Sequence, residues 1–213
     1  MPSYPLPRKD FLINTDFDRF NLPEYNEFKE IINVCASQPI LVKLTPILLR
    51  TLFESLLLDI FNTSLAKAQR AFVYANRYNR SFSELISLFN ILIEDFFIKN
   101  YSLKIPQKIV DNLNRIREDG NLDVHQIITG VEDDYPQQIR GKVKFLLRHL
   151  LGLYRKIDSG NNHIEIKDNT TLEKIHKKLR GLKWDPNNRQ EKKISFGGKI
   201  KRWIWMLFKK KDD

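Results

Sequence analysis

Residues 47–61 read Ile-Leu-Leu-Arg-Thr-Leu-Phe-Glu-Ser-Leu-Leu-Leu-Asp-Ile-Phe, and this strongly apolar stretch decides the fold class. Its apolar residues recur at helical spacing, and they belong to a longer helical pattern that runs from Gln38 to about Phe61. Pro46 lies inside that pattern, so it either kinks the helix or marks its true start, because a proline inside a helix removes a backbone hydrogen bond.

Arg50 and Glu54 are the polar residues that need an explanation, because they lie one turn apart on one face of this apolar helix. An ion pair within the helix is one explanation, but arginine before glutamate is the weaker orientation. Polar groups buried without partners cost stability, so we expect at least one of the two to reach another element. The turn at Gly120 is the expected partner.

Further helical patterns follow along the chain, and each begins at a recognisable start signal. These starts are Asn21-Leu22-Pro23, the capping box Ser81 to Glu84, Pro106 before a helix that Gly120 ends, Asp134-Tyr135-Pro136, and a second capping box formed by Thr170 and Glu173. Residues 158–169 indicate a connector with room for one short strand, and no series of strands is visible. The sequence therefore predicts an all-α bundle of four to six helices with a basic C-terminal appendage.

Changes in composition divide the chain into four segments. They are an N-terminal arm with the first helix (1–37), the helical bundle (38–157), a connector with a basic helix (158–183), and a polar linker followed by a Trp/Lys-rich tail (184–213). Residues 174–213 contain 14 Lys and Arg against 4 Asp and Glu, whereas residues 1–173 contain 22 of each sign. The formal net charge of +10 is therefore concentrated in the tail.

The rest of the composition points to a cytoplasmic location. The lone Cys35 excludes an internal disulfide framework and suits a reducing compartment. Residues 1–11 lack the basic start and apolar run of a secretory signal, and no apolar window approaches the length that spans a bilayer. The chain also has no phosphate-binding Gly-rich loop ending in Lys-Ser or Lys-Thr, which argues against a nucleoside triphosphatase.

Residues 116–125, Ile-Arg-Glu-Asp-Gly-Asn-Leu-Asp-Val-His, hold the candidate site. An arginine, a Gly-Asn turn and a histidine lie close together here, between two helical patterns. Arginine offers a fixed cation for phosphate, and histidine is the side chain best suited to proton transfer near neutral pH.

The order of these elements resembles an uncharacterised prokaryotic branch of the HEPN superfamily. The shared features are an apolar helix with Arg50 and Glu54, then Ile-Arg-x-x-Gly-Asn-x-x-x-His at 116–125, then a final apolar helix from Pro136 to about Tyr154. The resemblance covers roughly residues 38–156. It implies an antiparallel helical bundle, a homodimer, and a role in an antiviral defence or toxin–antitoxin system, where a partner protein of that system is also expected.

Many HEPN proteins are endoribonucleases that need no metal and no cofactor, and the resemblance implies the same here. His125 would be the general base or acid, Asn121 the polar orienting group and Arg117 the phosphate clamp, with Arg50, Glu54 and Gly120 in structural roles. The chain departs from the nuclease pattern at one point. Gly120 occupies the position where an arginine would directly precede Asn121.

A structural explanation of the same residues stands beside the catalytic one. Gly120 would allow a left-handed helix end, Asn121 would cap the next helix, and Arg117 would pair with a neighbouring carboxylate such as Glu118. His125 would then bond a backbone group or Glu54 inside the bundle.

Basic and aromatic residues near the C-terminus form a second candidate region, for nucleic acid or a partner. They are Lys177, Lys178, Arg180, Lys201, Arg202, Trp203 and Trp205. Residues 199–211 suit peripheral membrane contact, a partner groove or stacking on nucleic acid, or they dock on the bundle as a terminal helix. The sequence therefore indicates three candidate functions: a ribonuclease, a non-catalytic HEPN-like dimerisation or sensor subunit, and a peripheral-membrane effector.

Overall fold

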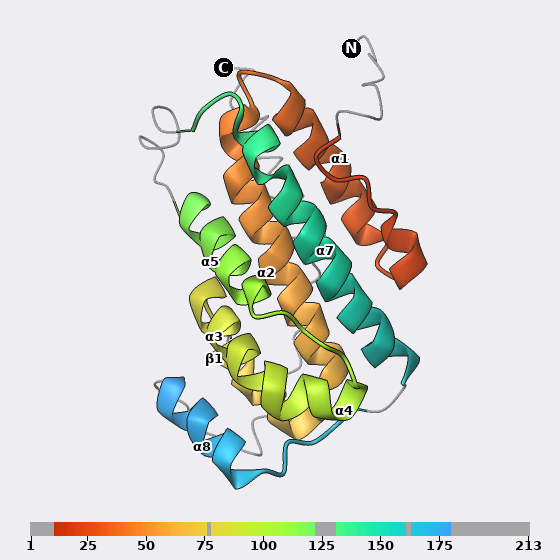
Figure 1. Ribbon diagram of the computed structural model, residues 1–213, viewed down its shortest axis with the longest axis vertical. Coiled ribbons are helices and arrows are strands. Elements are labelled where there is room, and N and C mark those ends of the chain that lie inside the picture. The colour runs from red at the N-terminus through yellow and green to blue at the C-terminus, as the bar shows by residue number, and fades with distance from the viewer. Residues whose placement is uncertain (1–10, 76–77, 122–130, 161–162, 180–213) are drawn as a thin grey trace.

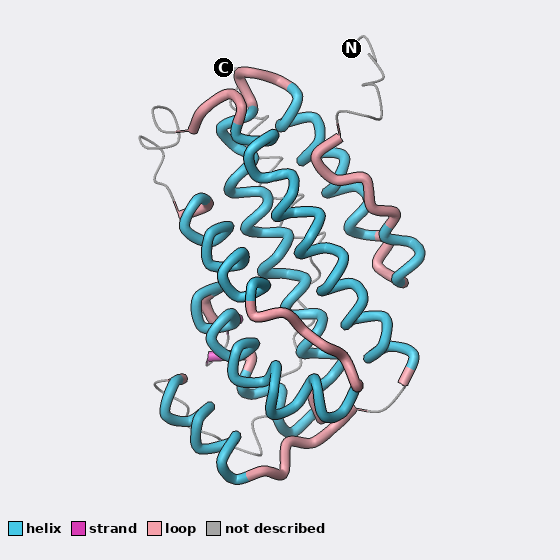
Figure 2. Tube along the Cα trace, in the orientation of Figure 1, coloured by secondary structure: helices cyan, strands magenta, loops and turns pink. Residues whose placement is uncertain are grey.

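The computed structural model describes residues 11–75, 78–121, 131–160 and 163–179, and these form a helical bundle (Figures 1 and 2). Its α-helices are α1 (Glu24–Ser37), α2 (Thr45–Ser64), α3 (Phe82–Leu92), α4 (Lys99–Tyr101), α5 (Lys108–Asp119), α7 (Tyr135–Ser159) and α8 (Asn169–Lys178). Shorter elements are the 3₁₀-helices η2 (Phe17–Phe20), η3 (Val42–Leu44) and η4 (Lys67–Phe72), the π-helix η5 (Ile93–Ile98), and the antiparallel pair β1 (Tyr74–Ala75) and β2 (Tyr78–Asn79). The predicted all-α class is confirmed.

Helix α2 is the element that the others surround. It contacts α1, α3, α5 and α7, and in Figure 1 α1 and α5 run in the direction opposite to α2 and α7. Its apolar side chains are buried almost all round the helix, as expected for an element covered on several sides. The fully buried ones are Leu49, Leu52, Phe53, Leu56, Leu57, Ile60 and Phe61.

The start signals in the sequence explain where most helices begin. Pro46 lies in the first turn of α2, so it marks the start of that helix and does not kink it. The capping box at Ser81 and Glu84 is present at the start of α3. The second predicted box is wrong, because the side chain of Asp168 caps α8 and Thr170 lies within that helix. Both Asp and Thr are good capping residues, and Asp168 comes first along the chain.

A buried arginine holds together the short elements that the sequence pattern did not predict. Arg80 is 2% exposed. Its Nε donates to the carbonyl oxygen of Phe72 at 2.6 Å, and its Nη1 donates to Glu84 Oε1 at 2.9 Å. Because these bonds satisfy a charge that would otherwise be costly to bury, η4 is tied to the start of α3.

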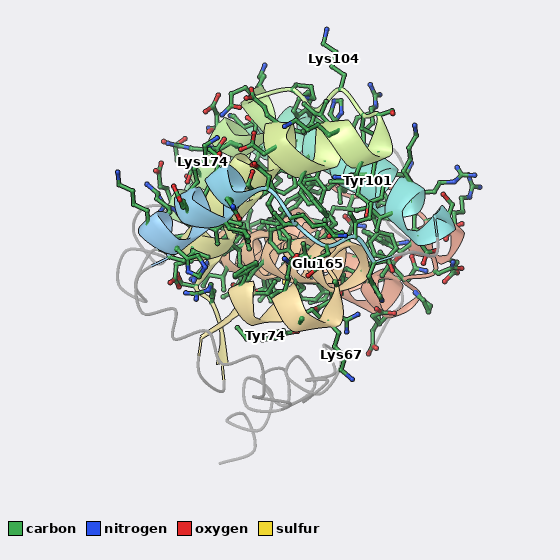
Figure 3. All side chains as sticks on the ribbon, turned by 90° about the horizontal axis from the view of Figure 1, so that it is seen from below. Lys67, Tyr74, Tyr101, Lys104, Glu165 and Lys174 are labelled. Atoms are coloured by element: carbon green, nitrogen blue, oxygen red, sulfur yellow. The ribbon has the colours of Figure 1, made fainter. Side chains whose placement is uncertain are left out.

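Residues 163–179 cover the lower end of the bundle in Figure 1, where α8 contacts α3. The Gln69 amide exchanges two hydrogen bonds with the backbone of Ile166, at 2.7 and 2.6 Å. One parallel bridge joins Leu65 to Ile164, where the sequence left room for a short strand. Lys174 on α8, labelled in Figure 3, donates to Asp95 Oδ2 at 2.8 Å. Within the described ranges, no helix has the length and apolar character needed to cross a bilayer.

The contact between α1 and α2 includes a buried acid. The hydroxyl of Tyr25 donates to Asp59 Oδ2. Burial raises the pKa of the Asp59 carboxyl to about 6, the hydrogen bond from Tyr25 opposes this rise, and Glu24 adds to it. The protonated form of Asp59 is therefore favoured in the folded protein more than in the unfolded chain.

We predict that Asp59→Asn removes a pH-dependent part of the stability. The folded-state pKa lies above the ordinary value of 3.8. The contribution is therefore complete below about pH 4 and is lost as the pH rises through about 6. At about 1.4 kcal/mol per pKa unit, it is at most about 3 kcal/mol. Denaturant unfolding of both proteins between pH 4 and 8 measures it, and identical pH slopes would contradict the expectation.

Candidate functional site

The end of α5 packs against α2 so closely that the residue at position 120 has no room for a side chain. A Cβ built on Gly120 would lie 2.6 Å from the Cβ of Arg50 and 2.8 Å from the carbonyl oxygen of Pro46. Neither atom can move without moving the α2 backbone. Gly120 has φ −87° and ψ −1°, so the expected left-handed helix end is wrong. Close approach, and not an unusual backbone conformation, is the reason for glycine here.

Arg50 uses this close approach to reach the end of α5. Its Nη1 donates to the carbonyl oxygen of Gly120 at 3.4 Å, a long hydrogen bond. That carbonyl belongs to the last turn of α5, where backbone oxygens lack partners inside the helix and a cation is favourable. The prediction that a polar residue of the apolar helix reaches the Gly120 turn is therefore confirmed. Glu54 lies half-buried one turn further along α2.

A second contact fastens the same end of α5 to the start of α7. Asp119 accepts a hydrogen bond from the Tyr135 hydroxyl at 3.1 Å and forms an ion pair with Arg115 Nε at 3.0 Å. Burial raises the pKa of the Asp119 carboxyl, and Arg115 and Tyr135 partly offset that rise. Burial and the adjacent Asp119 also raise the pKa of Tyr135 well above its ordinary value, so its hydroxyl stays protonated and donates.

Arg117 turns toward α3 and away from the contact between Gly120 and Arg50. Its Nη1 donates to Ser83 Oγ at 2.9 Å, and its Nη2 lies 3.2 Å from Glu118 Oε1. The side chain of Arg117 is 25% exposed, and its Nε is buried without a hydrogen-bond partner in the described part of the chain. The pairing with Glu118 matches the structural explanation of this residue.

The predicted catalytic residues fall partly outside the described ranges. Asn121 is exposed, and its N–H donates to the carbonyl oxygen of Glu118 at 3.2 Å. His125 lies in 122–130, outside the described residues. What the structure does place is the two ends of that segment, because the end of α5 and the start of α7 are each held by the contacts above.

The predicted basic region also lies only partly within the described residues. Lys177 and Lys178 are exposed on α8. In Figure 1, α8 lies at the end of the bundle opposite to the start of α7. The remaining members of the predicted region lie outside the described residues, namely Arg180, Lys201, Arg202, Trp203 and Trp205.

Sequence reasoning missed three residues that shape this region: Ser83, Arg115 and Tyr135. The spacing of Arg115 and Asp119, one turn apart in a predicted helix, was a usable signal for their ion pair. No signal in the sequence links Ser83 to Arg117 or Tyr135 to Asp119, because these contacts join different helices. Among the residues that the structure describes, no group of three or more His, Cys, Asp or Glu side chains could hold a metal ion.

No family model matches this chain, and comparison with curated proteins and with solved structures likewise gives no match.

We predict that Gly120→Ala destabilises the protein by about 1–3 kcal/mol, because the added methyl group forces α5 away from α2. The matched control is Gly141→Ala in α7, where a Cβ would meet nothing within 4 Å. That change replaces a poor helix former with a good one, and we expect it to stabilise the protein by about 0.5–1 kcal/mol. Thermal or denaturant unfolding measures both. Equal effects of the two variants would contradict the close approach.

Proposed function

We propose that this chain is an RNA-directed, HEPN-like protein of a prokaryotic defence or toxin–antitoxin system, acting as a homodimeric, metal-independent endoribonuclease. The observation that carries the proposal is the contact of Arg50 with the backbone of Gly120. It joins the two parts of the sequence pattern that resembles HEPN proteins, the Arg-x-x-x-Glu helix and the Gly-Asn helix end.

The proposed chemistry is cleavage of RNA by its own ribose 2′-hydroxyl. His125 removes or returns the proton, Asn121 orients the reacting groups, and Arg117 stabilises the charge that develops on the phosphorus centre. Arg117 must then exchange Glu118 for phosphate. That exchange costs little, because Glu118 is 58% exposed and ion pairs at the surface contribute weakly.

One observation favours the second candidate, a non-catalytic HEPN-like subunit that binds RNA or a partner protein. Both terminal nitrogens of Arg117 already have partners within the same bundle, Ser83 and Glu118. A side chain held in this way suits a structural role at the end of α5. The two candidates differ in one outcome, which is whether RNA is cut.

We predict that the purified full-length protein cleaves single-stranded RNA in the presence of EDTA. His125→Ala should lower the rate at least 100-fold, as expected for loss of a general acid or base, without weakening RNA binding. His176→Ala on α8 is the matched control and should cleave at the wild-type rate. Gel electrophoresis of a labelled RNA measures cleavage, and fluorescence anisotropy measures binding.

The results separate the candidates. Binding without cleavage in the wild-type protein would reject the nuclease and support the non-catalytic subunit. Neither binding nor cleavage would reject an RNA-directed function.

A further inference from the structure

Helix α7 carries a concentrated positive charge. Residues 135–157 contain six basic and no acidic residues, namely Arg140, Lys142, Lys144, Arg148, Arg155 and Lys156. Residues 1–173 contain 22 of each sign, so the rest of that region has 16 basic against 22 acidic residues. Residues 1–173 are therefore neutral in total, but the basic residues are in excess on α7 and the acidic residues are in excess elsewhere.

The cations at the centre of this helix have no partners in the described part of the chain. Lys144, Arg148, Arg155 and Lys156 are exposed, and none of their side chains forms a hydrogen bond or an ion pair there. Some cations elsewhere in the bundle are paired. Lys174 pairs with Asp95, and Arg115 pairs with Asp119. Helix α7 carries no acidic residue before Asp158.

These cations form a row along the helix. Lys144, Arg148 and Arg155 are separated by four and seven residues, so they lie on one side of α7 at intervals of about 6 and about 10 Å. In Figure 1, α7 runs the length of the bundle at the front of the view. A row of this kind matches a chain of negative charges that lies along the helix.

An aromatic pair lies beside the row. The rings of Phe145 and His149 have centroids 4.5 Å apart, and both side chains are half-buried. Lys108, at the start of α5, places its Nζ 6.0 Å from the centre of the Phe145 ring. Gly141 and Gly152 flank the pair on the same side of α7, and a Cβ added at either would meet nothing within 4 Å. There is therefore space for a small group at each of these two glycines.

We infer that this face of α7, defined by Lys144, Phe145, Arg148, His149 and Arg155, binds single-stranded RNA. Its basic row would contact consecutive phosphates, and its aromatic pair would stack with bases, the combination used by proteins that bind single strands. The inference rests on the proposed function and adds the path that the RNA takes. The start of α7 is fastened to the end of α5 through Tyr135 and Asp119, so this face belongs to the helix that packs next to the end of α5.

Two other occupants fit the face less well. A second copy of the chain, related by two-fold symmetry, would bring the same cations against each other. A membrane surface attracts cations too, but stable binding also needs large exposed apolar side chains. In the described residues the large exposed apolar side chains are Val34 and Ile40, and neither is on α7.

The test is charge reversal on the full-length protein. We expect Lys144→Glu with Arg148→Glu to weaken binding of a fluorescent 20-nucleotide RNA at least 10-fold, as measured by anisotropy. The slope of log affinity against log salt should fall by about 1.4, because each phosphate contact to a single strand contributes about 0.7. The matched control is Lys67→Glu with Lys167→Glu, two exposed lysines outside α7, which changes the net charge equally and should leave affinity within about 2-fold. Circular dichroism verifies that both variants fold.

Phe145→Leu provides a separate measurement, because leucine fills the packed space but cannot stack with a base. We expect at least 5-fold weaker binding of single-stranded RNA and unchanged binding of duplex RNA. Equal loss for both RNAs would overturn the stacking role of Phe145.

Each outcome of the charge-reversal experiment decides one question. If the wild-type protein binds RNA and the α7 variant binds equally well, this inference fails and the proposed function stands. Equal loss in the α7 variant and the control variant would show general attraction by net charge and would overturn it too. If the wild-type protein binds no RNA, both fail. RNA binding retained while the α7 variant loses binding to phosphatidylserine vesicles would assign the face to membranes instead.

Discussion

The close approach of Gly120 to helix α2 is the constraint on which the candidate site depends. A backbone-to-backbone contact of this kind leaves no room for adjustment, because a Cβ at position 120 would meet the Cβ of Arg50 and the carbonyl oxygen of Pro46 within 3 Å. The contact fixes where α5 ends. It also brings a backbone carbonyl within reach of Arg50, which gives that arginine a partner on an otherwise apolar helix. Asp119, the residue before Gly120, then reaches Tyr135 and positions the start of α7.

Electrostatics divides the bundle into two kinds of surface. Around the end of α5 the charges are paired, as in the contacts of Arg115 with Asp119 and of Arg117 with Glu118. Along α7, the exposed side chains of Lys144, Arg148 and Arg155 form no ion pair with the described residues, and the helix carries no acidic residue before Asp158. Paired charges suit a region that holds helices together. The row of cations along α7 is the surface to which we assign RNA binding.

The sequence predicted where the helices begin better than it predicted why particular residues occupy their positions. Start signals at Pro46 and Ser81 placed α2 and α3, because capping and proline effects are local. The contact between Arg50 and the Gly120 turn was also predictable, since a buried polar group needs a partner. The reason for Gly120 was not, because a glycine at a helix end also fits a left-handed cap, and only the neighbouring helix distinguishes the two. The short elements near Arg80 depend on its bonds to Phe72 and Glu84, which no local pattern contains.

Amide hydrogen exchange tests the central claim most directly. The N–H groups of Gly120 and Asn121 donate to the carbonyl oxygens of Ile116 and Glu118. If contact with α2 holds the end of α5, exchange in residues 116–121 should be slow in the wild-type protein. Gly120→Ala should speed it selectively, with the amides of α1 unchanged. Fast exchange of these amides in the wild-type protein, or an equal increase throughout the variant, would contradict the account.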